Sequence, residues 1–370
     1  MRLIKQFLIL ATITLFIRCQ ENTTTSPNYS TGTKEISLTE IWDGTFSTKR
    51  MNALNAMNGD FYSLLNTDSA GNSTVDKYSY KTLKKTETIV NSSDLEGLEG
   101  FSSYRFNADE SSVILGTNFK KIYRHSFTGS FYHYNVRTKK LHLIGKDIQE
   151  PTFSPKGEKI AFAKKNNLFI LNLSTGNTVT QVTKDGTTNH IINGITDWVY
   201  EEEFAFVRAF EWSKNGNYLA FLRFNESKVP TFSMDLVGKN NYPQQQVFKY
   251  PKAGEKNARV TLHVFNCASK KTNKVSLGAY EYIPRIKWSN AANILVATTL
   301  NRHQNNLKLH KVAVVKNKVT TLLNETDAAY LNITDNLTFL NDNSFIWTSE
   351  KDGYNHIYHY DFSGKLINQI

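Results

Sequence analysis

The residues with the clearest chemical potential lie in the segment from Thr196 to Phe204, where three adjacent glutamates, Glu201, Glu202 and Glu203, stand between aromatic side chains. Like charges a few ångströms apart repel by about 1 kcal/mol in water, and by several kcal/mol at the lower effective dielectric of a cleft. A cation between the carboxylates removes this cost. The segment therefore indicates a site that a cation visits.

The backbone must turn or form a short helical loop here if two adjacent glutamates are to face one cation, because a strand would send them to opposite faces. A primary ammonium offers three donors, and each charge-assisted hydrogen bond contributes about 1.5 to 3 kcal/mol. Two carboxylates could thus select a free α-amino group. The alternative is a solvent-facing acidic loop that offsets nearby lysines, and the residues alone leave both interpretations open.

The rest of the chain, from residue 35 onward, is a succession of short alternating apolar and polar runs separated by Asn, Asp, Gly and Ser turn clusters. A recurring unit places an aromatic residue before a turn and an apolar strand after it. The unit recurs at Phe106–Leu115, Phe153–Phe162, Trp212–Phe221, Trp288–Ala297 and Phe339–Trp347, with a further turn near Asn58-Gly59-Asp60.

The spacing of these units predicts an all-β fold of the β-propeller type, with about six units in this chain. The turn markers Gly59, Glu110, Gly157, Gly216, Ala292 and Asn343 lie between 47 residues (Glu110 to Gly157) and 76 residues (Gly216 to Ala292) apart. Each interval has room for four strands. A β-sandwich array gives no reason for an aromatic residue to precede the same turn in each unit. The longer intervals contain two insertions, Asp197–Phe204 and Pro230–Lys256, and insertions in repeat proteins mark working faces.

Several segments resemble the dipeptidyl peptidase IV family, in the family's order. They are Tyr123–Phe131, Asp197–Glu203, Phe224-Asn225-Glu226 with Val229-Pro230, and Tyr250–Gly254. The resemblance extends from about Ile36 to the last residue. It implies that Glu202 and Glu203 bind the substrate's free N-terminus, that Glu201 is structural, and that Arg124 contacts the substrate.

Arg124 also has a physical interpretation of its own, and the resemblance adds one further position, Tyr330. A planar guanidinium at Arg124 can bind a peptide carbonyl or the carboxylates of Glu202 and Glu203, whereas without the family match it reads as a surface arginine. Tyr330 falls roughly where the family places an aromatic residue that lines the substrate pocket, although Leu331 replaces an arginine found there in some members.

The resemblance implies a serine exopeptidase that releases N-terminal dipeptides of the Xaa-Pro or Xaa-Ala type, with the substrate ammonium setting the register. The family's serine lies in a G-x-S-x-G elbow of an α/β-hydrolase domain, and neither that motif nor βαβ alternation occurs in this sequence. No catalytic residue is therefore assigned. The family's propeller has eight blades, so we expect an incomplete propeller over residues 35–370, inactive and prone to aggregate by itself. The alternative is a noncatalytic exported propeller that binds peptides or a protein partner.

Composition limits the remaining possibilities. The net charge of +11 comes from scattered lysines, so no nucleic-acid partner is expected. Residues 1–19 read as an export signal, which predicts a periplasmic or cell-envelope protein in a bacterium, and residues 20–34 read as a flexible tether. Cys19 stands where a lipoprotein cysteine would lie, although Arg18 fits such a site poorly, and lipidation there is the only expected membrane link.

No cofactor or metal is expected, because His356 and His359 fall on opposite faces of an alternating run. The expected partners are peptides with a free N-terminus, and the Pro230–Lys256 arm could support a homodimer, as it does in the family. The arm could also be a mobile insertion.

Overall fold

The structure is a computed structural model that describes residues 35–48 and 52–370. The predicted signal, the tether and Cys19 lie outside the described residues. The chain divides into two units after residue 51. In the first, helix α2 (Leu38–Trp42) begins with a capping box in which Ser37 and Glu40 satisfy each other's backbone amides, and it buries no residue. Among the described residues, no helix is long and apolar enough to cross a membrane.

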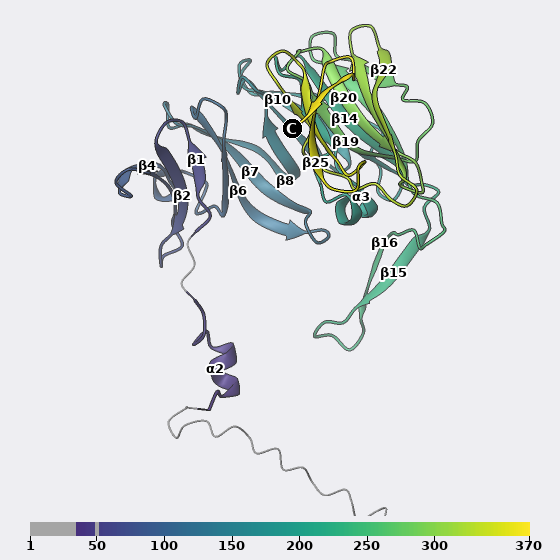
Figure 1. Ribbon diagram of the computed structural model, residues 1–370. Helices are drawn as coiled ribbons and strands as arrows, with labels where there is room; N and C mark the ends of the chain where they lie inside the picture. The colour runs from purple at the N-terminus through teal and green to yellow at the C-terminus, as the bar shows by residue number, and fades with distance from the viewer. Residues whose placement is uncertain (1–34, 49–51) are drawn as a thin grey trace, which may run out of the picture. The chain divides into compact units, whose positions relative to one another are not determined.

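The second unit, Asn52–Ile370, is built almost entirely of antiparallel strands (Figure 1). Its first two sheets contain eleven strands, and the 3-10 helix η1 (Ser92–Asp94) follows the first sheet. The four-stranded sheet consists of β1 (Asn55–Met57), β2 (Phe61–Thr67), β3 (Ser73–Ser79) and β4 (Lys85–Asn91). The seven-stranded sheet consists of β5 (Ser103–Phe106), β6 (Ser112–Lys121), β7 (Phe127–Asn135), β8 (Leu141–Phe153), β9 (Lys159–Lys164), β10 (Asn167–Asn172) and β11 (Thr178–Gln181).

The third sheet carries helix α3 (Trp198–Glu203) in a loop and a separate two-stranded arm. Its strands are β12 (Ile191–Asn193), β13 (Phe210–Trp212), β14 (Tyr218–Asn225), β17 (Arg259–Asn266) and β18 (Lys271–Val275), and the arm is β15 (Thr231–Leu236) with β16 (Gln244–Lys249). Figure 1 shows the arm extending away from the sheets. The last two sheets are β19 (Tyr282–Trp288), β20 (Ile294–Leu300), β21 (Asn306–Ala313) and β22 (Lys318–Thr326), then β23 (Thr338–Phe339), β24 (Phe345–Ser349), β25 (His356–Tyr360) and β26 (Leu366–Gln369).

The sheets form six blades of a β-propeller, which confirms the predicted fold. Strand β8 is long enough to pair with β7 through its first half and with β9 through its second, so the seven-stranded sheet counts as two blades that share β8. Each predicted turn joins the first strand of a blade to the second. Glu110 and Asn343 adopt the left-handed conformation there, with φ of +60° and +65°, and Gly157 and Gly216 do so without the strain of a side chain.

The aromatic residue of the repeat closes the first strand of its blade, and where it is a tryptophan it donates a hydrogen bond to the blade before it. The indole Nε1 of Trp212 donates to the backbone oxygen of Thr152 at 3.3 Å, and the indole of Trp288 donates to that of Glu211 at 2.9 Å. Thr152 and Glu211 each directly precede the aromatic residue of their own blade. At these two positions the aromatic residue therefore links consecutive blades.

Candidate functional site

Helix α3 presents the glutamate cluster. The Asp197 carboxylate caps its N-terminus by accepting a hydrogen bond from the backbone amide of Tyr200 at 3.0 Å. The chain leaves the helix through Ala205, whose φ of +56° is the left-handed conformation common after a helix. The predicted helical turn is confirmed, and it places the three glutamates on different sides of the segment.

Tyr200 fastens this short helix to the core. Its side chain is buried, and its ring packs against Phe204 and Phe224 with centroids 5.0 and 4.9 Å away. Its hydroxyl oxygen accepts a hydrogen bond from the backbone amide of Ile283 at 2.9 Å, in the next blade. The helix position is thus fixed by contacts to two blades.

Glu201 points inward and holds a distant loop. Its side chain is only 1% exposed, and its Oε1 accepts hydrogen bonds from the backbone amides of His125 at 2.6 Å and Ser126 at 2.9 Å. These amides belong to the connection between β6 and β7, which also carries Arg124. The structural role that the resemblance implied for Glu201 agrees with these contacts.

Glu202 and Glu203 are less buried than Glu201, and the loop brings Arg124 to Glu202. The Nε of Arg124 lies 3.0 Å from Oε2 of Glu202. The Glu202 side chain is 17% exposed and that of Arg124 is 72% exposed, so solvent weakens the ion pair. Glu203 is exposed and has no ion pair within the described part of the chain. An approaching cation would meet one paired and one free carboxylate.

A group of buried acids lies behind these carboxylates. Burial raises the pKa of Asp197 to about 6. Burial, and then the charge of Asp197, raises the pKa of Glu226 to about 7, and Lys249 partly opposes this. Burial, followed by the charges of Glu226, Asp197 and Glu201, raises the pKa of the Tyr123 phenol. The interior face of the site is therefore acidic and partly protonated near neutral pH.

Aromatic side chains at the base of the arm pack against both segments of the site. Tyr250 contacts Trp198, the first residue of α3, with ring centroids 4.4 Å apart. Phe248 contacts Tyr123, which precedes Arg124, at 5.9 Å, and Phe232 joins the two arm rings. These contacts could not be predicted from the sequence, because the residues lie far apart along the chain.

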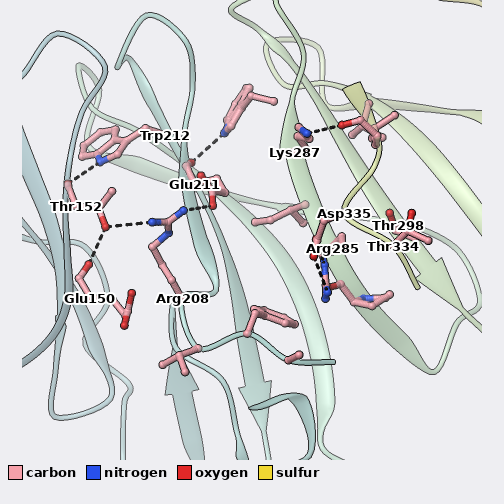
Figure 2. Close-up of a pocket in the computed structure, with 18 of the residues that line it drawn as sticks. Glu150, Thr152, Arg208, Glu211, Trp212, Arg285, Lys287, Thr298, Thr334 and Asp335 are labelled. Atoms are coloured by element: carbon pink, nitrogen blue, oxygen red, sulfur yellow. Dashed lines mark hydrogen bonds and ion pairs between the residues drawn. The ribbon is translucent and has the colours of Figure 1, made fainter. Parts of the chain in front are cut away.

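A cavity of about 880 Å³ adjoins the site (Figure 2). The first strands of three blades line it, through β8, β13 and β19, and His125 and Ala205 also lie in its wall. Ion pairs join Arg208 to Glu211 at 2.6 Å and Arg285 to Asp335 at 2.5 Å across its surface. Arg124, Glu202 and Glu203 are not part of this lining, so the glutamates stand beside the cavity rather than inside it.

Tyr330 contacts its own loop rather than the glutamates. It is 52% exposed in the loop after β22, where its backbone amide donates to the carboxylate of Asp327 at 3.2 Å. No hydrogen bond or ring contact joins it to Arg124, Glu202 or Glu203 in the described ranges. The residues described also contain no cluster of three or more His, Cys, Asp or Glu side chains suited to a metal ion.

Comparison with known families matches residues 107–370 to the dipeptidyl peptidase IV (DPP IV) N-terminal region. The chain belongs to this family. The crystal structure of Porphyromonas gingivalis dipeptidyl peptidase 4 is similar to this DPP IV N-terminal region, with a TM-score of 0.85 and 35% sequence identity over 92% of this chain and 49% of that one.

Curated relatives agree with the DPP IV assignment. Dipeptidyl peptidase 4 of Trichophyton rubrum is 32% identical over 288 residues, and that of Trichophyton tonsurans is 30% identical over 287. In both cases the match covers 72% of this chain and 36% of the relative. The chain thus spans about a third of the length of these relatives.

The raised pKa of Glu226 predicts a change in stability with pH. Between its ordinary pKa of 4.5 and about 7, the folded protein holds a proton that the unfolded chain releases, so this group's stabilising contribution falls as pH rises. We expect the free energy of unfolding of Glu226→Gln, relative to that of the wild type, to increase from pH 5 to pH 8. The increase is at most about 1.4 kcal/mol per pH unit between the two pKa values. Urea unfolding at both pH values measures the difference.

The matched control is Glu158→Gln, because Glu158 is exposed in the turn between β8 and β9. Its stability relative to the wild type should not vary with pH. Equal stability differences between Glu226→Gln and the wild type at pH 5 and pH 8 would show that Glu226 does not hold an extra proton in the folded protein.

Proposed function

We propose that this chain is the propeller part of an exported dipeptidyl peptidase IV-like serine exopeptidase, in which Glu202 and Glu203 anchor the substrate's free N-terminal ammonium. The observation that carries the proposal is the Glu202 carboxylate on α3, 3.0 Å from the Arg124 guanidinium, with the exposed Glu203 as the next residue of the helix. The family assignment and the names of the relatives support the reaction class.

The chemistry of the anchor follows from charge and geometry. Glu203 offers an unpaired carboxylate, and Glu202 shares one of its oxygens with Arg124. An ammonium placed between the two glutamates would form charge-assisted hydrogen bonds to both, while Arg124 keeps Glu202 in position and has donors left for a peptide carbonyl. With the N-terminus held there, hydrolysis after the second residue releases a dipeptide, preferentially Xaa-Pro or Xaa-Ala as in the family.

The bond-breaking step would belong to a hydrolase domain outside these 370 residues, because the sequence has no G-x-S-x-G motif. Export is part of the same proposal and rests on residues 1–19, with lipidation at Cys19 as the only membrane link. Tyr330 stays a proposed pocket residue because of the family resemblance. Its side chain is exposed and is therefore free to contact a substrate.

The double variant Glu202→Ala, Glu203→Ala tests the anchor in the full-length protein. Losing two charge-assisted hydrogen bonds should lower kcat/KM for Gly-Pro and Ala-Pro p-nitroanilides by at least about 100-fold. Glu158→Ala, an exposed glutamate outside the site, is the matched control. Unchanged kcat/KM in the double variant would rule out the anchor.

We propose a second copy of the chain as the partner of the β15–β16 arm. The arm exposes Met234, Leu236, Val237, Tyr242 and Val247, a group of apolar residues that water solvates poorly. Val237 and Tyr242 are 87% and 85% exposed, so charge can be added there with little expected effect on the fold.

The expected result for Val237→Glu, Tyr242→Glu is a change from dimer to monomer in light scattering at micromolar concentration, with secondary structure retained. Placing charges in an apolar contact costs several kcal/mol, enough to abolish a moderate interface. A wild-type protein that is already monomeric, or a variant that stays dimeric, would rule out this surface.

A further inference from the structure

The loop that carries Arg124 has little to hold it in place by itself. It connects the end of β6 at Lys121 to the start of β7 at Phe127. Its internal hydrogen bonds run from the amide of Ile122 to the oxygen of Ser126 at 2.9 Å and from the amide of Tyr123 to the Ser126 hydroxyl at 3.2 Å. The Arg124 side chain is largely exposed. Its position beside Glu202 therefore needs another restraint.

Glu201 restrains the backbone of this loop. Two consecutive backbone amides, those of His125 and Ser126, both donate to its Oε1, at 2.6 and 2.9 Å. Successive amides that converge on one oxygen form a concave anion-binding arrangement, and charge-assisted bonds of this kind are about twice as strong as neutral ones. Because the carboxylate is 1% exposed, water cannot replace the amides at little cost.

The second oxygen of Glu201 takes no part in holding the loop. Its Oε2 is buried and makes no hydrogen bond to the described residues. One acceptor oxygen in the right place is thus sufficient for both amide bonds. A glutamine could reproduce these two bonds through its amide oxygen, without the charge.

Neighbouring residues of α3 bind different parts of the Arg124 loop. Consecutive side chains on a helix point about 100° apart, since a turn takes 3.6 residues. Glu201 faces inward to the loop backbone, while Glu202 faces outward to the Arg124 guanidinium. The loop is therefore attached to the helix twice, once through its backbone and once through its arginine side chain.

We propose that Glu201 is a positioning residue for the ammonium anchor: by binding the amides of His125 and Ser126, it keeps Arg124 beside Glu202. This inference rests on the proposed function of Glu202 and Glu203. Glu201 does not touch the substrate. Its contribution to turnover passes through Arg124, so the effects of changing the two residues are not independent.

A double-mutant cycle in the full-length protein tests this coupling, with Ala-Pro p-nitroanilide as the probe. Glu201→Ala should lower kcat/KM by about tenfold or more, mainly through KM, because two hydrogen bonds to a charged group are lost. In an Arg124→Ala background the same change should lower it by less than about threefold, since residues acting on one function are non-additive. Glu201→Gln should lose less than Glu201→Ala.

Hydrogen–deuterium exchange gives a readout that does not depend on turnover. The amides of His125 and Ser126 should exchange faster in Glu201→Ala and keep their wild-type protection in Glu202→Ala. Glu158→Ala is again the matched control for removing a glutamate. Unchanged protection in Glu201→Ala would overturn the inference even if that variant were inactive.

The outcomes separate this inference from the proposed function. If Arg124→Ala and Glu202→Ala leave kcat/KM unchanged, the ammonium anchor is wrong and Glu201 has nothing to position. If both lower kcat/KM but Glu201→Ala has the same fold-effect with and without Arg124, only the positioning role is wrong. A loss of kcat/KM that Glu201→Ala causes only when Arg124 is present, together with faster exchange at residues 125 and 126, supports the positioning role.

Discussion

The buried attachment of α3 fixes every other part of the candidate site. A helix of six residues is far too short to be stable by itself, so its conformation depends on tertiary contacts. Tyr200 provides one, by inserting its ring into the core and accepting a hydrogen bond from the next blade. Glu201 provides the other, through two backbone amides of the Arg124 loop. These inward contacts leave Glu202 and Glu203 facing outward.

Electrostatics adds a constraint on the same region. Asp197 and Glu226 are buried behind the helix, and burial raises the pKa of both carboxyl groups, with the charge of Asp197 raising that of Glu226 further. Their partial protonation limits the negative charge behind the helix. The arm adds mechanical support, since Tyr250 and Phe248 pack on the segments that hold the glutamates and Arg124.

The sequence predicted the propeller because five of the six blades repeat a local rule: an aromatic residue closes the first strand and a tight turn follows it. Trp212 and Trp288 make the same contact with the preceding blade, so their spacing carried fold information. The need for two adjacent glutamates to face one cation likewise predicted the turn at α3, because a strand would send them to opposite faces. The pairing of Arg124 with Glu202 came from family resemblance, and the arm contacts were missed, because sequence spacing does not reveal which distant loops meet. The burial of Glu226 could not be predicted from the sequence either, since a single acidic residue after a strand is ordinarily exposed.

The central claim is that the carboxylates on α3 recognise a free ammonium, and calorimetric binding of matched peptides tests it most directly. Ala-Pro-Ala and its N-acetylated counterpart differ only at the N-terminus, where acetylation replaces a charged ammonium and its three donors with a neutral amide and an acetyl group. The account predicts that acetylation weakens binding to the protein by at least about tenfold, the loss of one charge-assisted hydrogen bond. Equal affinity for the two peptides would contradict it.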